Sequence, residues 1–273
     1  MFKDITLGQY YPSDSAIHKL DPRTKILTMI FYIVAVFLVN RIYAFIFPAI
    51  YVVSVMLIAK IPLRYIKNSI KPIKWIIIFM FILNLFLSTN VENPTVVFEW
   101  WILRITHESI YRSIYISLRL ITLVAGTSLM TLTTTPISLT DGLERLLAPL
   151  KAIKFTVHEL AMMMTIALRF IPTLLEEVDK ITKAQLARGA DFESGSIIKR
   201  AKSMIPILIP LFISAFRRAD ELAMAMESRC YHGGDGRTKM NVLKFHINDL
   251  YAILVMVGMC AVIVVIQMLL PIL

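Results

Sequence analysis

The stretch LYAILVMVGMCAVIVVIQMLLPIL, residues 250–273, contains no charged side chain, and it decides the fold class. A helix that crosses a bilayer needs about 20 mostly apolar residues, so this stretch predicts a transmembrane helix. The stretch IYAFIFPAIYVVSVMLIA at 42–59 meets the same requirement. The windows 26–40, 75–90 and 120–135 either need flanking residues to meet it or must lie in the interior of the helix bundle. We therefore predict an all-α integral membrane protein that has about five transmembrane helices and, in addition, long amphipathic helices in the cytoplasm.

The composition supports this class. Of all residues, 57% are hydrophobic and the mean hydropathy is +0.69, whereas ordinary soluble domains are nearer one half apolar. The chain carries 29 Lys and Arg against 19 Asp and Glu, a balance that also occurs in nucleic-acid binders. The long uncharged windows favour the lipid bilayer as the partner, and no nucleic acid is expected.

The distribution of charge predicts the orientation. The segment 60–74 has five basic residues and no acid, whereas 89–112 has three glutamates against two arginines. Because cytoplasmic loops carry an excess of Lys and Arg, the first segment is expected inside and the second outside. The N-terminus is then cytoplasmic and the C-terminus external in the cell membrane.

The same reasoning divides the chain into three parts. Four spans fall in 1–136, a cytoplasmic or interfacial region covers 137–249, and the last transmembrane helix occupies 250–273. The middle part opens with an amphipathic segment at 137–152, for which Thr140 or Asp141 is the predicted N-cap.

Two long helices are predicted in this middle region, at 157–188 and 197–229. Each is apolar in its first half and polar in its second, and each contains proline, which bends helices. Glu176 and Glu177 are interpreted as a solvated face that pairs with the lysines at 180 and 183 at helical spacing.

Both long helices end in an arginine between two small residues, and the two motifs are 41 residues apart. An arginine at a helix C-terminus complements the helix dipole, for about 0.3–1 kcal/mol. Two such ends favour a second interpretation, because small neighbours let a partner approach and the guanidinium offers five hydrogen-bond donors. The predicted docking residues are Ala187, Arg188, Gly189, Ser228, Arg229 and Cys230.

The sequence gives weaker signals for other kinds of functional site. The five histidines are scattered and predict no metal site, and no cofactor is expected; Cys230 and Cys260 are interpreted as packing residues without a disulfide. The glycine-rich segment 232–239 lacks the Gly-Lys-Ser/Thr of a phosphate loop. Arg119 and Arg169 are either functional groups at membrane depth or side chains that reach the surface, and the sequence leaves both open.

Two longer stretches resemble one family. GQYYPSDSAIHKLDPRTKIL at 8–27, and the segment 187–239 that begins ARGADF, are similar to the transmembrane T components of energy-coupling factor transporters, and most similar to the shared form of Gram-positive bacteria. The resemblance implies a non-catalytic coupling subunit of an ATP-driven vitamin or micronutrient importer. The second arginine motif departs from the family pattern, with Ser228 for alanine and Cys230 for glycine.

The resemblance also implies partners. Two ABC ATPase subunits, of the A and A′ types, would dock on the two arginine motifs, and an interchangeable membrane-embedded S component would bind the substrate. Methionines repack readily against different partners, so Met163, Met204 and the neighbouring Ile207 are candidates for contact with the S component.

Two alternatives stay open. One is a T component dedicated to cobalt, nickel or biotin uptake. The other is a membrane enzyme in which Arg188 and Arg229 hold an anionic substrate, although no nucleophile, acid–base pair or metal cluster accompanies them in the sequence. The sequence does not name the vitamin, because this subunit would not recognise it.

Overall fold

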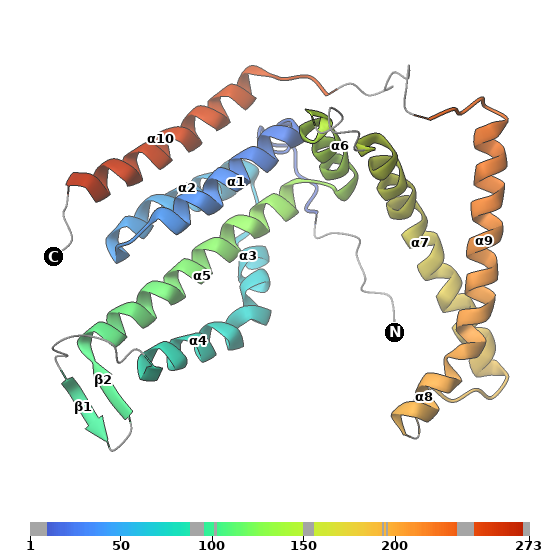
Figure 1. The fold of residues 1–273 in the computed structure, drawn as a ribbon, viewed down its shortest axis with the longest axis horizontal. Helices are drawn as coiled ribbons and strands as arrows, with labels where there is room; N and C mark the ends of the chain where they lie inside the picture. Colours follow the sequence, from blue (N-terminus) through green and yellow to red (C-terminus); the bar gives the residue numbers. More distant parts are fainter. Residues whose placement is uncertain are drawn as a thin grey trace. The chain divides into compact units, whose positions relative to one another are not determined.

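The computed structural model describes residues 10–87, 96–100, 103–149, 156–192, 194, 196–233 and 243–269 (Figure 1). It divides into two compact units. The bundle unit comprises Gly8–Gly142 and Leu243–Leu273, and the arm unit comprises Met1–Leu7 and Leu143–Val242. Assignment of the predicted parts 1–136, 137–249 and 250–273 to membrane or cytoplasm stays a prediction.

Among the described residues of the bundle unit, the regular secondary structure is helical apart from one short hairpin. Strand β1 (Val96–Trp100) pairs antiparallel with β2 (Leu103–Thr106), and Glu99 lies opposite Arg104. The helices and 3₁₀ turns are α1 (Pro22–Leu38), η1 (Ile42–Phe45), α2 (Ile46–Ala59), α3 (Leu63–Ile70), η2 (Lys71–Ile73), α4 (Lys74–Leu87), α5 (His107–Thr133) and α10 (Ile247–Leu269).

Five helical segments among the described residues are long and apolar enough to cross a membrane. Four of them match predicted windows: Ile42–Ala59, Leu63–Phe86, His107–Thr133 and Ile247–Leu269. The fifth is α7 (Val157–Ala187), which the sequence places in the coupling region. The predicted window 26–40 lies in α1, whose 17 residues give about 25 Å of helix against a hydrocarbon core of about 30 Å.

The core of the bundle unit forms where α1 packs against α5 and α10. Tyr32 is buried and its hydroxyl donates to the carbonyl of Thr122 at 2.7 Å. Its ring lies directly over Gly126, where a Cβ atom would stand 2.2 Å from Tyr32 Cε1. The absence of a side chain at Gly126 is therefore what lets α1 and α5 approach so closely.

The N-terminus of α1 is bound to the N-terminus of α10 by a buried carboxylate. Asp249 accepts a hydrogen bond from the backbone N–H of Asp21 at 2.8 Å and, through its other oxygen, from the N–H of His246 at 2.8 Å. Asp21 in turn caps α1 by accepting from the N–H of Arg23 at 2.9 Å. Both helix ends thereby gain acceptors for N–H groups that lack partners within the helix.

The C-terminus of α1 is also held by side chains from other helices. Arg119 of α5 donates to the carbonyl of Val39 at 2.8 Å, Tyr115 donates to the same oxygen at 2.5 Å, and Gln267 of α10 donates to the carbonyl of Leu38. Arg119 therefore has a structural role that the sequence did not predict, because it satisfies the last carbonyls of a neighbouring helix.

The basic segment 60–74 is not an extended loop. Lys60 ends α2 in the left-handed conformation, with φ of 56°, and α3, η2 and α4 then follow without a break. The side chain of Ile66 is buried, while Arg64 and Lys67 are exposed. This amphipathic pattern explains why the segment is helical, since it buries its apolar side against the bundle.

The described part of the arm unit contains α7, α8 (Ile197–Ser203) and α9 (Ile205–Glu227), and α6 (Pro136–Leu146) crosses the boundary between the units. The predicted helix at 157–188 is confirmed by α7. The predicted helix at 197–229 is divided at Met204, because Pro206 has no N–H to continue the helical hydrogen bonds.

Two further expectations in this region are wrong. The N-cap of α6 is Thr135, whose hydroxyl accepts from the N–H of Ser138 at 3.2 Å. Thr140 lies inside the helix and donates to the carbonyl of Pro136 at 3.0 Å, and Asp141 is likewise a helical residue. The helix ends at Leu146 rather than 152, and 150–155 fall outside the described residues.

Candidate docking site at two helix ends

Helices α7 and α9 run in opposite directions and contact each other (Figure 1). Glu177 of α7 pairs with Arg218 of α9 at 3.2 Å and accepts a hydrogen bond from Ser214. Gln185, near the end of α7, donates to the carbonyl of Pro206, at the start of α9, at 3.4 Å. The expected surface pairing of Glu177 with the lysines is therefore wrong, because Glu177 faces α9; Asp179 instead pairs with Lys183 at 2.5 Å.

The first arginine motif forms a specific helix end. The N–H of Gly189 donates to the carbonyl of Leu186 at 3.0 Å, and the N–H of Ala190 donates to that of Gln185 at 3.0 Å. Gly189 has a φ of 84°, as predicted for the residue after the C-cap. These are the two bonds of a Schellman motif, which satisfies carbonyls at the end of a helix, and Arg188 is its C-cap.

The second motif forms the same helix end. The N–H of Cys230 donates to the carbonyl of Glu227 at 2.9 Å, and the N–H of Tyr231 donates to that of Met226 at 3.1 Å. Cys230 has a φ of 56°, and its place in the second motif is equivalent to that of Gly189 in the first. Although α9 itself is assigned to end at Glu227, this bond pattern places Arg229 at the position of Arg188.

The two ends explain why an arginine stands between small residues. The position after the arginine adopts the left-handed conformation, which glycine tolerates and larger residues resist. Arg188 and Arg229 are exposed, and neither side chain has a hydrogen bond or ion pair to any residue that the structure describes. Cys230 is exposed as well, so its interpretation as a packing residue is wrong.

The two ends are related by the pair that joins the helices. Arg188 lies 11 residues beyond Glu177, and Arg229 lies 11 residues beyond Arg218. At 1.5 Å per residue, each arginine is about 16 Å along its helix from this pair. Because the helices are antiparallel, the arginines lie at opposite ends, as two equal arms. Their 41-residue spacing also relates Glu177 to Arg218, but the sequence alone does not show that these two meet.

The three candidate residues for contact with the S component differ in their exposure to solvent. The side chains of Met163 and Met204 are exposed, at 55% and 49%, whereas Ile207 is 8% exposed and buried. Ile207 is thus an interior residue of the arm unit and not a surface contact. Its neighbours Leu208, Ile209 and Phe212 are exposed, and they extend the apolar surface of α9 at helical spacing.

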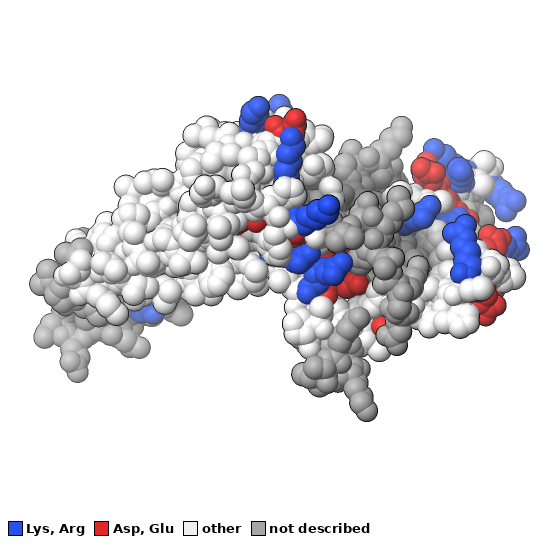
Figure 2. Space-filling model, turned by 90° about the horizontal axis from the view of Figure 1, so that it is seen from above, with Lys and Arg blue, Asp and Glu red and all other residues white. Residues whose placement is uncertain are grey.

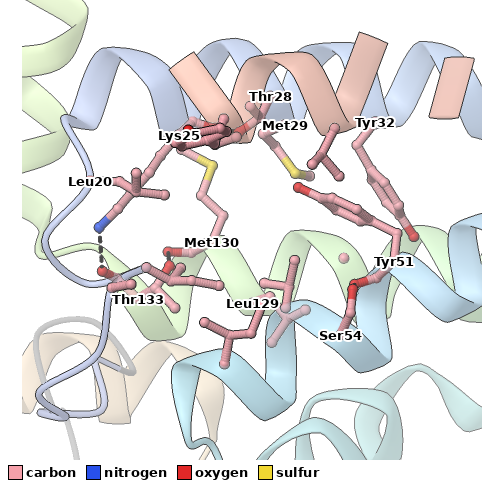
Figure 3. Close-up of a pocket in the computed structure, with 18 of the residues that line it drawn as sticks. Leu20, Lys25, Thr28, Met29, Tyr32, Tyr51, Ser54, Leu129, Met130 and Thr133 are labelled. Carbon is pink, nitrogen blue, oxygen red and sulfur yellow. Dashed lines mark hydrogen bonds between the residues drawn. The ribbon is translucent and has the colours of Figure 1, made fainter. Parts of the chain in front are cut away.

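A cavity of about 310 Å³ lies in the bundle unit among α1, α2, α5 and α10. Figure 3 shows Tyr32 and Tyr51 at one end and Lys25 at the other, joined to Thr133. The Lys25 ammonium donates to the carbonyls of Thr133 at 2.9 Å and His18 at 3.1 Å. Its charge therefore ties the segment before α1 to the end of α5.

Charged side chains are unevenly distributed on the bundle unit. On the face in Figure 2, most of the surface over its long helices is uncharged, and Lys, Arg, Asp and Glu gather toward one end. Across the described ranges, no group of three His, Cys, Asp or Glu residues is placed to hold a metal ion. An apolar belt with charge at its end suits helices that lie in a bilayer.

Comparison with known proteins identifies the family. Residues 13–240 match the family model described as "Cobalt transport protein". The chain is 52% identical over 265 residues to the "Energy-coupling factor transporter transmembrane protein EcfT" of Clostridium kluyveri, covering 97% of this chain and 96% of the relative. The chain belongs to this family.

Other relatives in the family carry the same name. The protein of Acidaminococcus fermentans is 54% identical over 259 residues, covering 95% of each chain. That of Bacillus subtilis is 44% identical over 261 residues, covering 96% of this chain and 97% of the relative. The resemblance to T components of energy-coupling factor transporters is confirmed. The chain is a multi-pass membrane component of such a transporter, which agrees with a non-catalytic subunit rather than with a membrane enzyme.

Proposed function

We propose that this chain is the coupling subunit of an ATP-driven vitamin or micronutrient importer, and that its two arginine ends dock two ATPase subunits of the A and A′ types. The observation that carries the proposal is the pair of equal arms, with the same Schellman geometry and an exposed arginine at each end. Equal arms suit two similar partners, since each partner meets the same backbone turn and the same guanidinium.

The chemistry of docking follows from the arginine. A guanidinium binds carboxylates or backbone carbonyls through several hydrogen bonds in a fixed geometry. Because neither arginine is paired with a described residue, docking needs no internal contact to break. The left-handed residue beside each arginine turns the chain away, so a partner surface can enclose the helix end.

Motion would pass between the ATPases and the S component through the arms. When the ATPases approach each other on binding ATP, the two ends move, and the joined helices α7 and α9 carry that movement to the apolar surface. The exposed apolar side chains are in two groups: Met163 lies near the start of α7, and Met204, Leu208, Ile209 and Phe212 lie at or near the start of α9. Apolar contact is non-directional, which suits a subunit that serves several S components.

Both ends must face the cytoplasm for ATPases to bind. We infer that the N-terminus is cytoplasmic, the C-terminus external, and that α7 lies at the inner interface although its length and composition would permit a span. The exposed Cys230 tests this in the chain expressed without ATPases. An impermeant thiol reagent should label Cys230 only after cells are permeabilised, and labelling in intact cells would refute the orientation.

The docking experiment uses the full complex. Arg188→Ala and Arg229→Ala should each weaken ATPase binding, because removing one partner of a buried charged hydrogen bond costs about 2–5 kcal/mol. The matched control is Arg217→Ala, an exposed arginine of α9 away from the end. Full ATPase recovery with the Arg188→Ala/Arg229→Ala double variant would show that docking lies elsewhere.

A second candidate function has a specific observation behind it. The family model that matches residues 13–240 is described as "Cobalt transport protein", which favours a T component dedicated to one metal. Purification with several S components from the same cell distinguishes the two. A shared subunit recovers more than one S component, whereas a dedicated subunit recovers one and supports cobalt or nickel uptake alone.

A further inference from the structure

One face of α3 and the following turn carries an unbroken row of cations. Arg64, Lys67 and Lys71 recur at spacings of three and four residues, which places them on one face of a helix. Asn68 lies in the same row, and Lys74 continues it into α4. All of these side chains are exposed.

These cations are not neutralised within the protein. None of the side chains of Arg64, Lys67, Lys71 and Lys74 has a hydrogen bond or ion pair to a residue in the described ranges. The sequence from 60 to 91 contains no Asp or Glu at all. Like charges at this spacing repel one another, so an external anion would stabilise the row.

The row lies where a membrane surface would be. It leads directly into α4, part of the apolar segment Leu63–Phe86 that is long enough to cross a bilayer. Trp75, at the start of that apolar helix, is 75% exposed, and its neighbour Ile76 is also exposed. Trp is enriched at the depth of lipid headgroups, and Trp75 at that depth would place the adjoining cations among the headgroups.

A recess beside the row of cations is a candidate binding site for a lipid headgroup. It has a volume of about 450 Å³ and is lined by Tyr11, Pro62, Arg64, Tyr65 and Asn68. The rings of Tyr11 and Tyr65 pack together, with centroids 4.9 Å apart. The recess therefore combines a guanidinium and an amide with a wall of aromatic carbon, groups that suit a phosphodiester and the glycerol next to it.

We propose that the α3 face, comprising Arg64, Lys67, Asn68 and Lys71 with the adjoining recess, binds the phosphate headgroups of anionic phospholipids. An acidic protein surface would satisfy the cations but not the exposed Trp75 and Ile76, whereas a bilayer satisfies both. Clusters of Lys and Arg beside a transmembrane helix bind anionic lipids in this way. The proposal is independent of the proposed transport function.

The test measures lipid retention by the full chain. The protein is placed in bilayers containing equal amounts of phosphatidylglycerol and phosphatidylcholine, extracted, and its bound lipids are counted by native mass spectrometry. We expect phosphatidylglycerol to be retained in preference. Each cation near an anionic surface contributes about fivefold in affinity, so the Arg64→Gln/Lys67→Gln/Lys71→Gln variant should lose a preference on the order of 100-fold.

A matched control removes equal charge elsewhere. The Lys180→Gln/Arg217→Gln/Lys244→Gln variant changes three other exposed cations, and its lipid preference should stay unchanged. Glutamine has nearly the helix propensity of lysine and arginine, and single variants, each expected to lose about fivefold, serve if the triple variant does not fold.

Four outcomes would overturn the proposal. The preference would survive in the triple variant if the lipid bound elsewhere, and it would fall equally in the control if overall charge caused it. Loss of ATPase recovery with unchanged lipid preference would assign the face to a protein. Inorganic phosphate at millimolar concentration should not displace the lipid, and displacement would indicate a site for free phosphate.

Discussion

Replacing Gly189 by alanine isolates the contribution of the left-handed turn to the first arginine end. The φ of Gly189 is 84°, and a Cβ atom there would meet nothing within 4 Å, so the cost is confined to the backbone. That conformation destabilises a residue with a Cβ by roughly 1–2 kcal/mol. Alanine also has less conformational freedom than glycine in the unfolded chain, which offsets about 0.4–1 kcal/mol of this cost. The net loss is about 1 kcal/mol at this end of the helix.

The assay for this prediction is amide hydrogen exchange. The N–H of Ala190, bonded to the carbonyl of Gln185, should exchange about fivefold faster in the Gly189→Ala variant, since 1.4 kcal/mol corresponds to a factor of ten. Cys230→Gly should act in the opposite direction on the N–H of Tyr231, because it removes the same cost from the second end. Gly258→Ala, within α10, should leave both amides unchanged. Equal exchange in all variants would refute the role assigned to the turn.

Four further predictions concern the bundle unit. Gly126→Ala should destabilise the protein by about 1–3 kcal/mol, measured as thermal unfolding in detergent, because the new methyl group meets the Tyr32 ring. Asp249→Ala should cost about 1–3 kcal/mol for each of the two N–H groups left without an acceptor; Asp249→Asn, which keeps one acceptor, should cost less. Burial holds the pKa of His18 below its ordinary 6.5, so protonation favours the unfolded chain. The free energy of unfolding should therefore fall as the pH drops through 6.5, and His18→Gln should flatten that dependence in thermal scans. Thr95→Cys, in a segment outside the described residues, should be labelled in intact cells by an impermeant thiol reagent, and protection until permeabilisation would contradict the orientation.

Much of the fold could be predicted because its signals are local. Long uncharged windows identify α2, α4, α5 and α10, and the change from apolar to polar residues identifies α7. The left-handed Gly189 follows from glycine placed after a helix. The arginine ends were likewise predictable, since a small residue, an arginine and a small residue recur after two similar helices.

What could not be predicted depends on contacts between distant residues. Arg119 looked like an ionisable group at membrane depth, and only the position of α1 reveals that it binds the carbonyl of Val39. Glu177 lies close in sequence to two lysines, yet the packing of α9 turns it toward Arg218. Ile207 has the composition of a contact surface, but burial is a property of the assembled pair of helices and not of the residue itself.

The bond between Asp249 and Asp21 has a consequence for how the protein is made. It joins the first long helix to the last one, through two residues whose numbers differ by 228, and Gln267 joins the same two helices at their far ends. During translation, α1 must therefore remain without these two contacts until synthesis of the chain is almost complete. A chain stopped after Tyr231 but before Ile247 would keep both arginine ends and lack the contacts of α10 to α1, so it should be cleaved by proteases more readily than the complete chain.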